Sequence, residues 1–227
     1  MLSPSMWKKS PATLPGGSEI RYPESEPIIV KTNGATTMRK RHVVLLLSLI
    51  LTSLPAAALK ISGVEIPDSL TLANGGPTLV LNGAGVREKL FLDIYIGALY
   101  LPAKTSDAQA ILSGSGPASV MMHFLYKEVS KEKITDAWTD GLTDNLTAAE
   151  MTALQSRLDK FNNLFRTMHE GEVIQISYLP GTGTEVRING EWRGNVEGDD
   201  FFHSLLAIWL GARPVSNSLK QGMLGIN

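Results

Sequence analysis

The sequence of 227 residues contains no cysteine, only four histidines, and almost no excess of either charge, with a formal net charge of −1. The absence of cysteine excludes disulfides, thiolate nucleophiles and cysteine-ligated zinc. His123, His169 and His203 fall in three different predicted elements and lack the paired spacing of metal ligands. We therefore expect no metal site and no cofactor.

Long apolar runs are also scarce, and the one that is present stands near the start of the chain. Residues 39–41 read Arg-Lys-Arg, residues 43–54 are mainly apolar, and residues 56–58 are alanines. This order of segments is typical of a secretory signal peptide, and a run of about 12 residues is too short to cross ~30 Å of hydrocarbon comfortably. We predict a signal peptide over residues 38–58 and export to the periplasm. A retained membrane anchor and a buried core helix are the alternatives.

Residues 1–37 contain little that could form a core. They are rich in Pro, Ser, Gly and Thr and show no apolar periodicity. Such a segment cannot bury enough apolar surface to offset the entropy lost on ordering it. We interpret it as a disordered N-terminal extension, or as a wrongly assigned start with synthesis beginning at Met38.

The remaining segment, residues 59–227, has the length of one domain of about 170 residues and is mildly acidic. It carries 14 Lys and Arg against 19 Asp and Glu, a net charge of −5. Binding to phosphates requires a basic patch, so a nucleic acid is not an expected partner. No stable membrane span is expected once the signal is removed.

The order of predicted elements in residues 59–227 indicates an α+β domain, in which an antiparallel sheet is covered on one face by helices. Thr147 and Glu150 have the spacing of a capping box that starts one of these helices. The expected strands cover residues 59–72 (two short strands), 78–87, 90–101, 118–125, 172–179 and 183–188. The expected helices cover residues 106–112, 130–146, a segment starting at 147, 199–210 and 216–224.

The hairpin formed by residues 78–87 and 90–101 is the most informative part of the sequence. A turn centred near Lys89 would pair Arg87 with Phe91, Gly85 with Asp93 and Gly83 with Tyr95, and directly opposed residues point to the same face. One face is then entirely apolar and is expected to be core: Ala84, Val86, Leu90, Leu92, Ile94, Ile96 and Ala98.

The opposite face of this hairpin combines small residues with a charge and a phenol. Its glycines, among them Gly83 and Gly85, leave space where another body can approach the backbone. Arg87 and Tyr95 would lie ~13 Å apart between α-carbons, so that their long side chains could converge on one carboxylate or phenolate. The alternative is an ion pair between Arg87 and Asp93 on a solvated face, with glycines that only relieve twist.

Two motifs in this hairpin resemble a known family. The sequence GAGVR at residues 83–87, followed by DIYIGALYLP at residues 93–102, resembles the chalcone isomerase family and more closely its exported bacterial chalcone isomerase-like branch. The resemblance extends more weakly over residues 59–227. It implies an open-faced β-sandwich with a ligand cleft between the sheet and the helices.

The resemblance also implies roles for individual positions. In the plant enzymes the motif arginine, here Arg87, holds the phenolate or enolate of the substrate. An arginine combined with a tyrosine in the second strand, here Tyr95, is instead similar to the fatty-acid-binding branch, where the pair binds a carboxylate. Other catalytic positions of the enzymes would fall near Ser130 or Lys131, near Ala137, and near Ala207 and Ile208.

We therefore predict a periplasmic protein that binds a small amphipathic carboxylate, such as a fatty acid, or a phenolic ligand. The predicted ligand-binding residues are Arg87, Tyr95, Phe91, Gly83 and Gly85. The alternative is an isomerase of the intramolecular lyase class, in which Arg87 stabilises an oxyanion and the other catalytic residues are unknown. A third possibility is a structural or partner-binding domain in which Arg87 pairs with Asp93.

Overall fold

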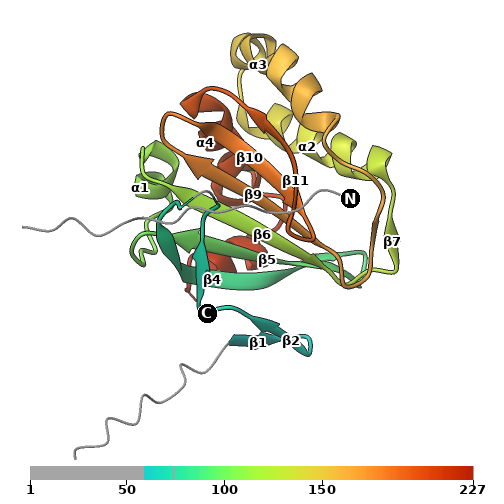
Figure 1. Ribbon diagram of the computed structural model, residues 1–227. Coiled ribbons are helices and arrows are strands. Elements are labelled where there is room, and N and C mark those ends of the chain that lie inside the picture. The colour runs from blue at the N-terminus through green and yellow to red at the C-terminus, as the bar shows by residue number, and fades with distance from the viewer. Residues whose placement is uncertain (1–58, 74, 227) are drawn as a thin grey trace, which may run out of the picture. The chain divides into compact units, whose positions relative to one another are not determined.

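The computed structural model describes residues 59–73 and 75–226, which form the domain shown in Figure 1. The predicted N-terminal extension (1–37) and signal peptide (38–58) lie outside the described residues. No helix within the described ranges is long and apolar enough to cross a membrane.

The centre of the domain is an antiparallel sheet of seven strands in the order β11-β10-β9-β6-β5-β4-β3. Two small two-stranded sheets, β1-β2 and β7-β8, accompany it. The strands are β1 Leu59–Ile61, β2 Val64–Ile66, β3 Ser69–Thr71, β4 Thr78–Lys89, β5 Leu92–Leu101, β6 Ala118–Phe124, β7 Glu128–Val129, β8 Met168–His169, β9 Val173–Leu179, β10 Gly183–Ile188 and β11 Glu191–Val196.

Five helices pack against one face of this sheet and share a single core with it. Asp107 caps the first of them in place of the expected Ser106, while the capping box of Thr147 and Glu150 is confirmed. Trp138 and Trp209 are among the largest side chains in the core between sheet and helices. The helices are α1 Ala108–Ser113, α2 Lys131–Asn145, α3 Ala148–Asn162, α4 Asp199–Leu210 and α5 Asn217–Met223.

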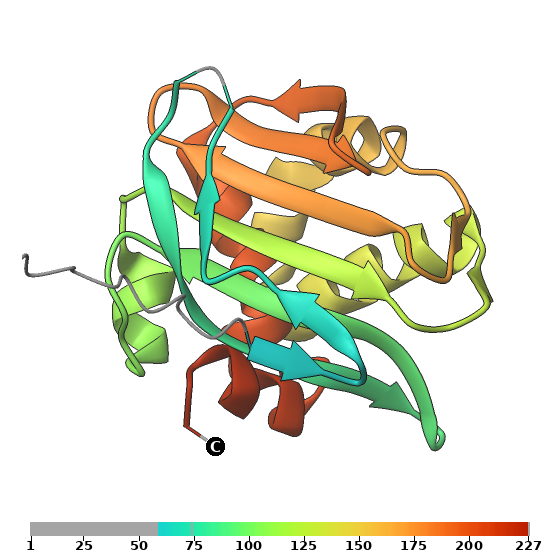
Figure 2. The ribbon, with the colours of Figure 1, turned by 60° about the horizontal axis from the view of Figure 1, so that its bottom comes forward.

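The opposite face of the sheet carries a second, smaller core. Ile66 of β2 is fully buried there against Ile96, Ala98 and Tyr100 of β5. The hydroxyl of Tyr100 donates a hydrogen bond to the carbonyl of Pro67, with 3.0 Å between the oxygens. The β1-β2 hairpin therefore covers this face of β4 and β5, as Figure 2 shows. The predicted α+β class with helices on one face is confirmed.

The register of the β4–β5 hairpin differs from the expected one. The turn consists of Leu90 and Phe91, and Arg87 pairs with Tyr95 rather than with Phe91. Gly85 pairs with Gly97 instead of Asp93, and an irregularity after Arg87 brings Glu88 opposite Asp93. The prediction was wrong because neither Leu90 nor Phe91 is a residue type that marks a turn.

Over most of the hairpin the register is displaced by an even number of residues. Because side chains alternate between the two faces, most residues keep their predicted faces. The predicted apolar face is buried in its central part, at Ala84, Ile96 and Ala98. These residues belong to the smaller core under β1-β2 and not to the main core under the helices. At its end the prediction was wrong, since Leu90 and Leu92 are 82% and 46% exposed. The face with Arg87 and Tyr95 is the one that the helices cover.

Candidate functional site: a cavity between the sheet and the helices

A cavity of about 470 Å³ lies between the β4–β5 hairpin, the end of β6, and helices α2 and α4. Its volume falls within the range of small-molecule sites, about 300–1,000 Å³. Most of its wall is apolar and includes Ile94, Met122, Phe124, Ile134, Trp138, Ile208 and Val215. The cavity can therefore hold a largely apolar molecule.

Arg87 and Tyr95 both line this cavity and are direct cross-strand partners. Partners in an antiparallel pair have β-carbons about 4.5–5.5 Å apart, so the two side chains start much closer together than the predicted register implied. The register brings a guanidinium and a phenol to one wall of an apolar cavity. This pair can hold a ligand with an anionic end and an apolar body.

Arg87 is half-buried and pairs with no acidic side chain of residues 59–73 and 75–226. Its Nη1 donates a hydrogen bond to the backbone carbonyl of Glu88, and no carboxylate of the described residues lies within salt-bridge distance of it. The alternative of an ion pair with Asp93 is therefore not what the structure shows. The remaining guanidinium donors are available to a ligand.

Tyr95 is buried and presents a protonated hydroxyl. Its Oη accepts a hydrogen bond from Nε1 of Trp209 at 3.0 Å. Burial raises the pKa of Tyr95 to about 12, although the bond from Trp209 and the charge of Arg87 act in the opposite direction. The Tyr95 hydroxyl donates to no acceptor among the described residues. Its proton can therefore be donated to a ligand.

Trp209 and Trp138 belong to the site although no pattern in the sequence singles them out. Trp209 on α4 positions the Tyr95 hydroxyl, and its ring packs edge-on against Trp138, with 5.8 Å between centroids. Trp138 on α2 lines the cavity, and its buried Nε1 has no hydrogen-bond partner in the described part of the chain. Aromatic residues at helical spacing read as ordinary core in the sequence, so only the tertiary contacts identify them.

The charged residues around the cavity are of both signs. Lys89 and Lys133 contribute positive charge, while Glu128, Asp136 and Asp140 contribute negative charge. No three His, Cys, Asp or Glu side chains of residues 59–73 and 75–226 gather in a way that could hold a metal ion. The cavity wall thus combines side chains of both charges with the hydrogen-bonding groups of Arg87 and Tyr95.

The sequence profile of the chalcone isomerase-like family matches residues 58–225. The chain belongs to the chalcone isomerase-like family. A solved structure of a fatty-acid binding protein from Arabidopsis thaliana is similar in fold, with a TM-score of 0.54 and 15% sequence identity over 69% of this chain and 95% of that chain. No curated protein sequence matches significantly. The predicted fold of the chalcone isomerase-like family is thus confirmed.

Two positions that the chalcone isomerase-like resemblance assigns to catalysis do reach the cavity. Ala137 on α2 and Ile208 on α4 both line it, and neither side chain can transfer a proton or donate a hydrogen bond. Ser130 does not line the cavity and serves as the N-cap of α2, accepting from the Lys133 amide. These positions therefore bring no proton-transferring or hydrogen-bonding side chain to the cavity.

The other predicted ligand-binding residues are not brought to the cavity. Phe91 is fully exposed at the tip of the hairpin. Gly83 and Gly85 lie beneath α5: a β-carbon on Gly83 would collide with the carbonyl oxygen of Gly222, and one on Gly85 would lie 3.4 Å from the Gly222 α-carbon. The glycines do permit a close approach, as predicted, but the approaching body is the C-terminal helix of the same chain.

Proposed function

We propose that this domain binds a small amphipathic carboxylate, such as a fatty acid, in the cavity between the sheet and the helices. Arg87 binds the carboxylate as a charge-assisted hydrogen-bond donor, and Tyr95 donates a second hydrogen bond. The apolar wall formed by β5, β6, α2 and α4 covers the hydrocarbon tail.

One observation carries this proposal: a half-buried guanidinium, which has no acidic partner in the described part of the chain, stands beside a protonated phenol on the wall of an apolar cavity. A buried or half-buried cation is costly unless an anion accompanies it. The fold shared with a protein named for fatty-acid binding supports the same ligand class. A phenolate of similar size would satisfy the same two donors.

Catalysis of the isomerase type is less well supported by the cavity. An isomerase needs a group that transfers or positions a proton, and Ala137 and Ile208 offer none at the family's positions. Tyr95 is not a general base at neutral pH, because its pKa is raised to about 12. Binding therefore accounts for the site better than turnover does.

The proposal includes export of the chain to the periplasm. Its basis is the order of basic, apolar and small residues in positions 39–58. The mass of the protein recovered from the periplasmic fraction would test it: a chain beginning at Leu59 is expected, and a full-length chain in the cytoplasm would contradict it.

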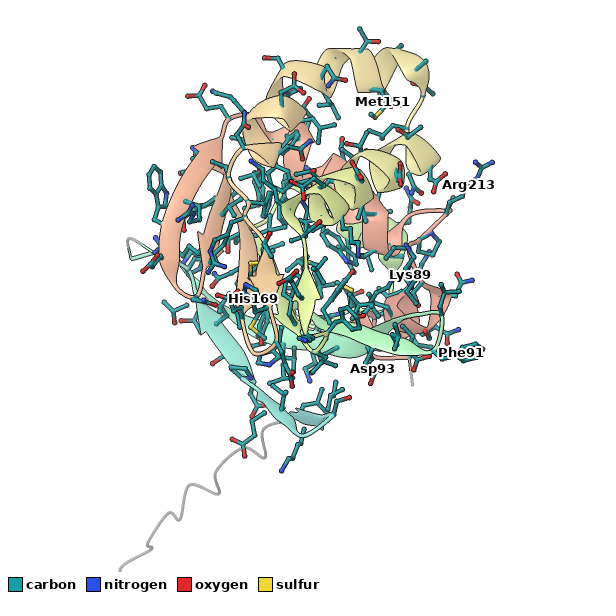
Figure 3. All side chains as sticks on the ribbon, turned by 90° about the vertical axis from the view of Figure 1, so that its right-hand side faces the viewer. Lys89, Phe91, Asp93, Met151, His169 and Arg213 are labelled. Atoms are coloured by element: carbon teal, nitrogen blue, oxygen red, sulfur yellow. The ribbon has the colours of Figure 1, made fainter. Side chains whose placement is uncertain are left out.

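Native mass spectrometry of the purified protein, followed by extraction of any bound lipid, tests the binding proposal. We expect a fatty acid to copurify with the wild type and to be lost from Arg87→Met, which keeps the apolar stem but removes the guanidinium. Arg213→Ala is the matched control, because Arg213 is exposed, lies on the side shown in Figure 3, and does not line the cavity.

Equal fatty-acid binding by Arg87→Met and the wild type would contradict the proposed role of Arg87. Turnover of 2′-hydroxychalcone by the wild type, with no acid bound, would establish the isomerase instead. Both measurements use the same preparation, so the two functions are separated in one experiment.

A further inference from the structure

Apolar side chains gather on the surface at the mouth of the cavity. Leu90, Leu92 and Tyr126 are exposed and at the same time line the cavity, and Phe91 is fully exposed beside Leu90. We call Leu90, Phe91, Leu92 and Tyr126 the apolar rim. It holds four of the seven large apolar side chains that are exposed in the described ranges; the others are Leu59, Trp192 and Ile226.

The rim stands on a hairpin that projects from the sheet. Strand β6 pairs with β5 only over Tyr95–Tyr100, so no third strand of the described residues pairs with the end of the β4–β5 hairpin near its turn. Figure 3 shows Phe91 at the outer end of this hairpin, beyond Asp93 and pointing away from the domain. Phe91 can therefore contact another body, such as a membrane or a second protein, before the rest of the domain reaches it.

The backbone of the turn makes its two side chains unexpected. Leu90 has a φ of 51° and Phe91 a φ of 67°, so both lie in the left-handed region. Two-residue hairpin turns of this kind favour Asn-Gly, whereas bulky residues are rare there. Leu and Phe at these positions cost stability and expose apolar surface, which indicates that the surface itself has a use.

We propose that the apolar rim inserts into the surface of a lipid bilayer, and that the cavity exchanges its ligand there. This inference rests on the proposed function, because an amphipathic carboxylate resides in bilayers. Leu90, Leu92 and Tyr126 belong to both the rim and the cavity wall. A ligand would therefore pass from the bilayer to the cavity along apolar side chains rather than through water.

The size and chemistry of the rim fit a bilayer better than a protein partner. Four side chains around a projecting turn offer far less area than the 1,200–2,000 Å² that a stable protein interface buries. Tyr126 has the amphipathic ring that is common at membrane surfaces, and the long side chain of the exposed Lys89 can keep its charge in the headgroup layer. Near the turn, Glu88 and Asp93 balance the charges of Arg87 and Lys89, so a neutral bilayer suffices.

Flotation of the ligand-free protein with phosphatidylcholine vesicles tests this inference. We expect the wild type to float with the vesicles and Phe91→Gly to bind about tenfold or more weakly, because burying a Phe side chain favours insertion by at least this factor. Glycine adopts a positive φ without strain, so this variant is expected to fold. Trp192→Thr, which removes an exposed aromatic of β11 instead, is the control and should float like the wild type.

Two further readings separate this inference from the proposed function. Phe91→Gly should keep its affinity for oleate added in solution, since Phe91 does not line the cavity, whereas Tyr95→Phe should bind oleate more weakly and still float. A wild type that does not float, or a Phe91→Gly variant that floats equally well, overturns the inference. The inference is also overturned if the wild type is a dimer and Phe91→Gly makes it a monomer without changing its flotation. The apolar rim would then bind a second copy of the chain.

Discussion

Tyr95 contributes to the site through one proton, and its environment keeps that proton in place. Burial raises its pKa to about 12, and the hydroxyl oxygen is already used as an acceptor for Trp209. A phenol with an ordinary pKa of about 10 would lose its proton at alkaline pH. Tyr95 therefore stays a hydrogen-bond donor to a pH well above the ordinary pKa of a phenol.

The proposed binding of a fatty acid should depend on pH as this shift of the Tyr95 pKa dictates. Because the folded pKa of Tyr95 is raised, we expect the affinity of the wild type for oleate to be constant from pH 7 to about 10.5 and to fall only as the pH approaches 12. Tyr95→Phe should reduce the affinity about tenfold at pH 8, the value of one hydrogen bond to a charged group. Titration calorimetry across this range would measure both effects, and a midpoint near pH 10 would contradict them.

At the scale of elements, Glu172 holds together three segments around the start of β9. It accepts hydrogen bonds from Nη1 and Nη2 of Arg166 at 2.9 and 2.6 Å, from the His169 amide at 2.8 Å and from Asn189 at 2.9 Å. These partners, chiefly Arg166, lower the pKa of Glu172 to about 2. The carboxylate thereby fixes the connection from α3 to β9 and the turn between β10 and β11.

Glu172→Gln is expected to lower the free energy of unfolding by about 2 kcal/mol at pH 7. This is less than the full pKa shift would give, because the Arg166 side chain is 41% exposed and water screens the pair. Since the folded pKa is depressed, the contribution is complete above the ordinary pKa of about 4.5 and is lost as the pH falls toward 2. Urea unfolding at pH 7 and pH 2.5 measures the difference, with the exposed Glu170→Gln as control; an equal effect at both pH values would rule out this account.

The elements differ in how far the sequence could predict them. The capping box at Thr147 and the hairpin of β9 and β10 carry local signals, and both are confirmed. The turn at Leu90 and Phe91 carries none, because its positive φ values depend on the pairing of β4 with β5 rather than on its own residues. The short strands β7 and β8 were not predicted either, since two residues each are too few for a periodic pattern.

The residues of the candidate site also differ in how far the sequence could predict them. Arg87 and Tyr95 could be selected because the register is displaced by an even number of residues at this point, which leaves both side chains on one face. The contact of Trp209 with Tyr95 joins residues 114 positions apart, and nothing in the local pattern of α4 indicates it. The role of α5 over Gly83 and Gly85 is likewise a contact between distant segments.

At the scale of the whole molecule, α5 closes the domain by packing its backbone onto the glycines of β4. A β-carbon on Gly222 would lie 2.6 Å from the Ala84 carbonyl oxygen and 2.9 Å from the Gly85 α-carbon. Asn82 adds a hydrogen bond from its side-chain amide to the carbonyl of Met223 at 2.8 Å. Backbone atoms of α5 meet backbone atoms of β4 at this contact, so no flexible side chain can move aside for an added methyl group.

Gly222→Ala is expected to destabilise the domain by about 1–2 kcal/mol, although alanine alone would favour the helix by about 1 kcal/mol. The steric clash of the added methyl group with β4 outweighs this gain, so the net change in the free energy of unfolding is destabilising. Gln221→Ala, an exposed position in the same helix, should change the stability little. Thermal and urea unfolding of the two variants would provide the comparison, and a stabilised Gly222→Ala would show that α5 does not pack as described.

The attachment of α5 to β4 also sets the order in which the chain can finish folding during its synthesis. Strand β4 is made early, but its glycine surface stays uncovered until residues 217–223 leave the ribosome, about 130 residues later by position in the chain. Leu219 and Met223, which are fully buried, complete the main core only then. The growing polypeptide can therefore complete its main core only after residues 217–223 have emerged.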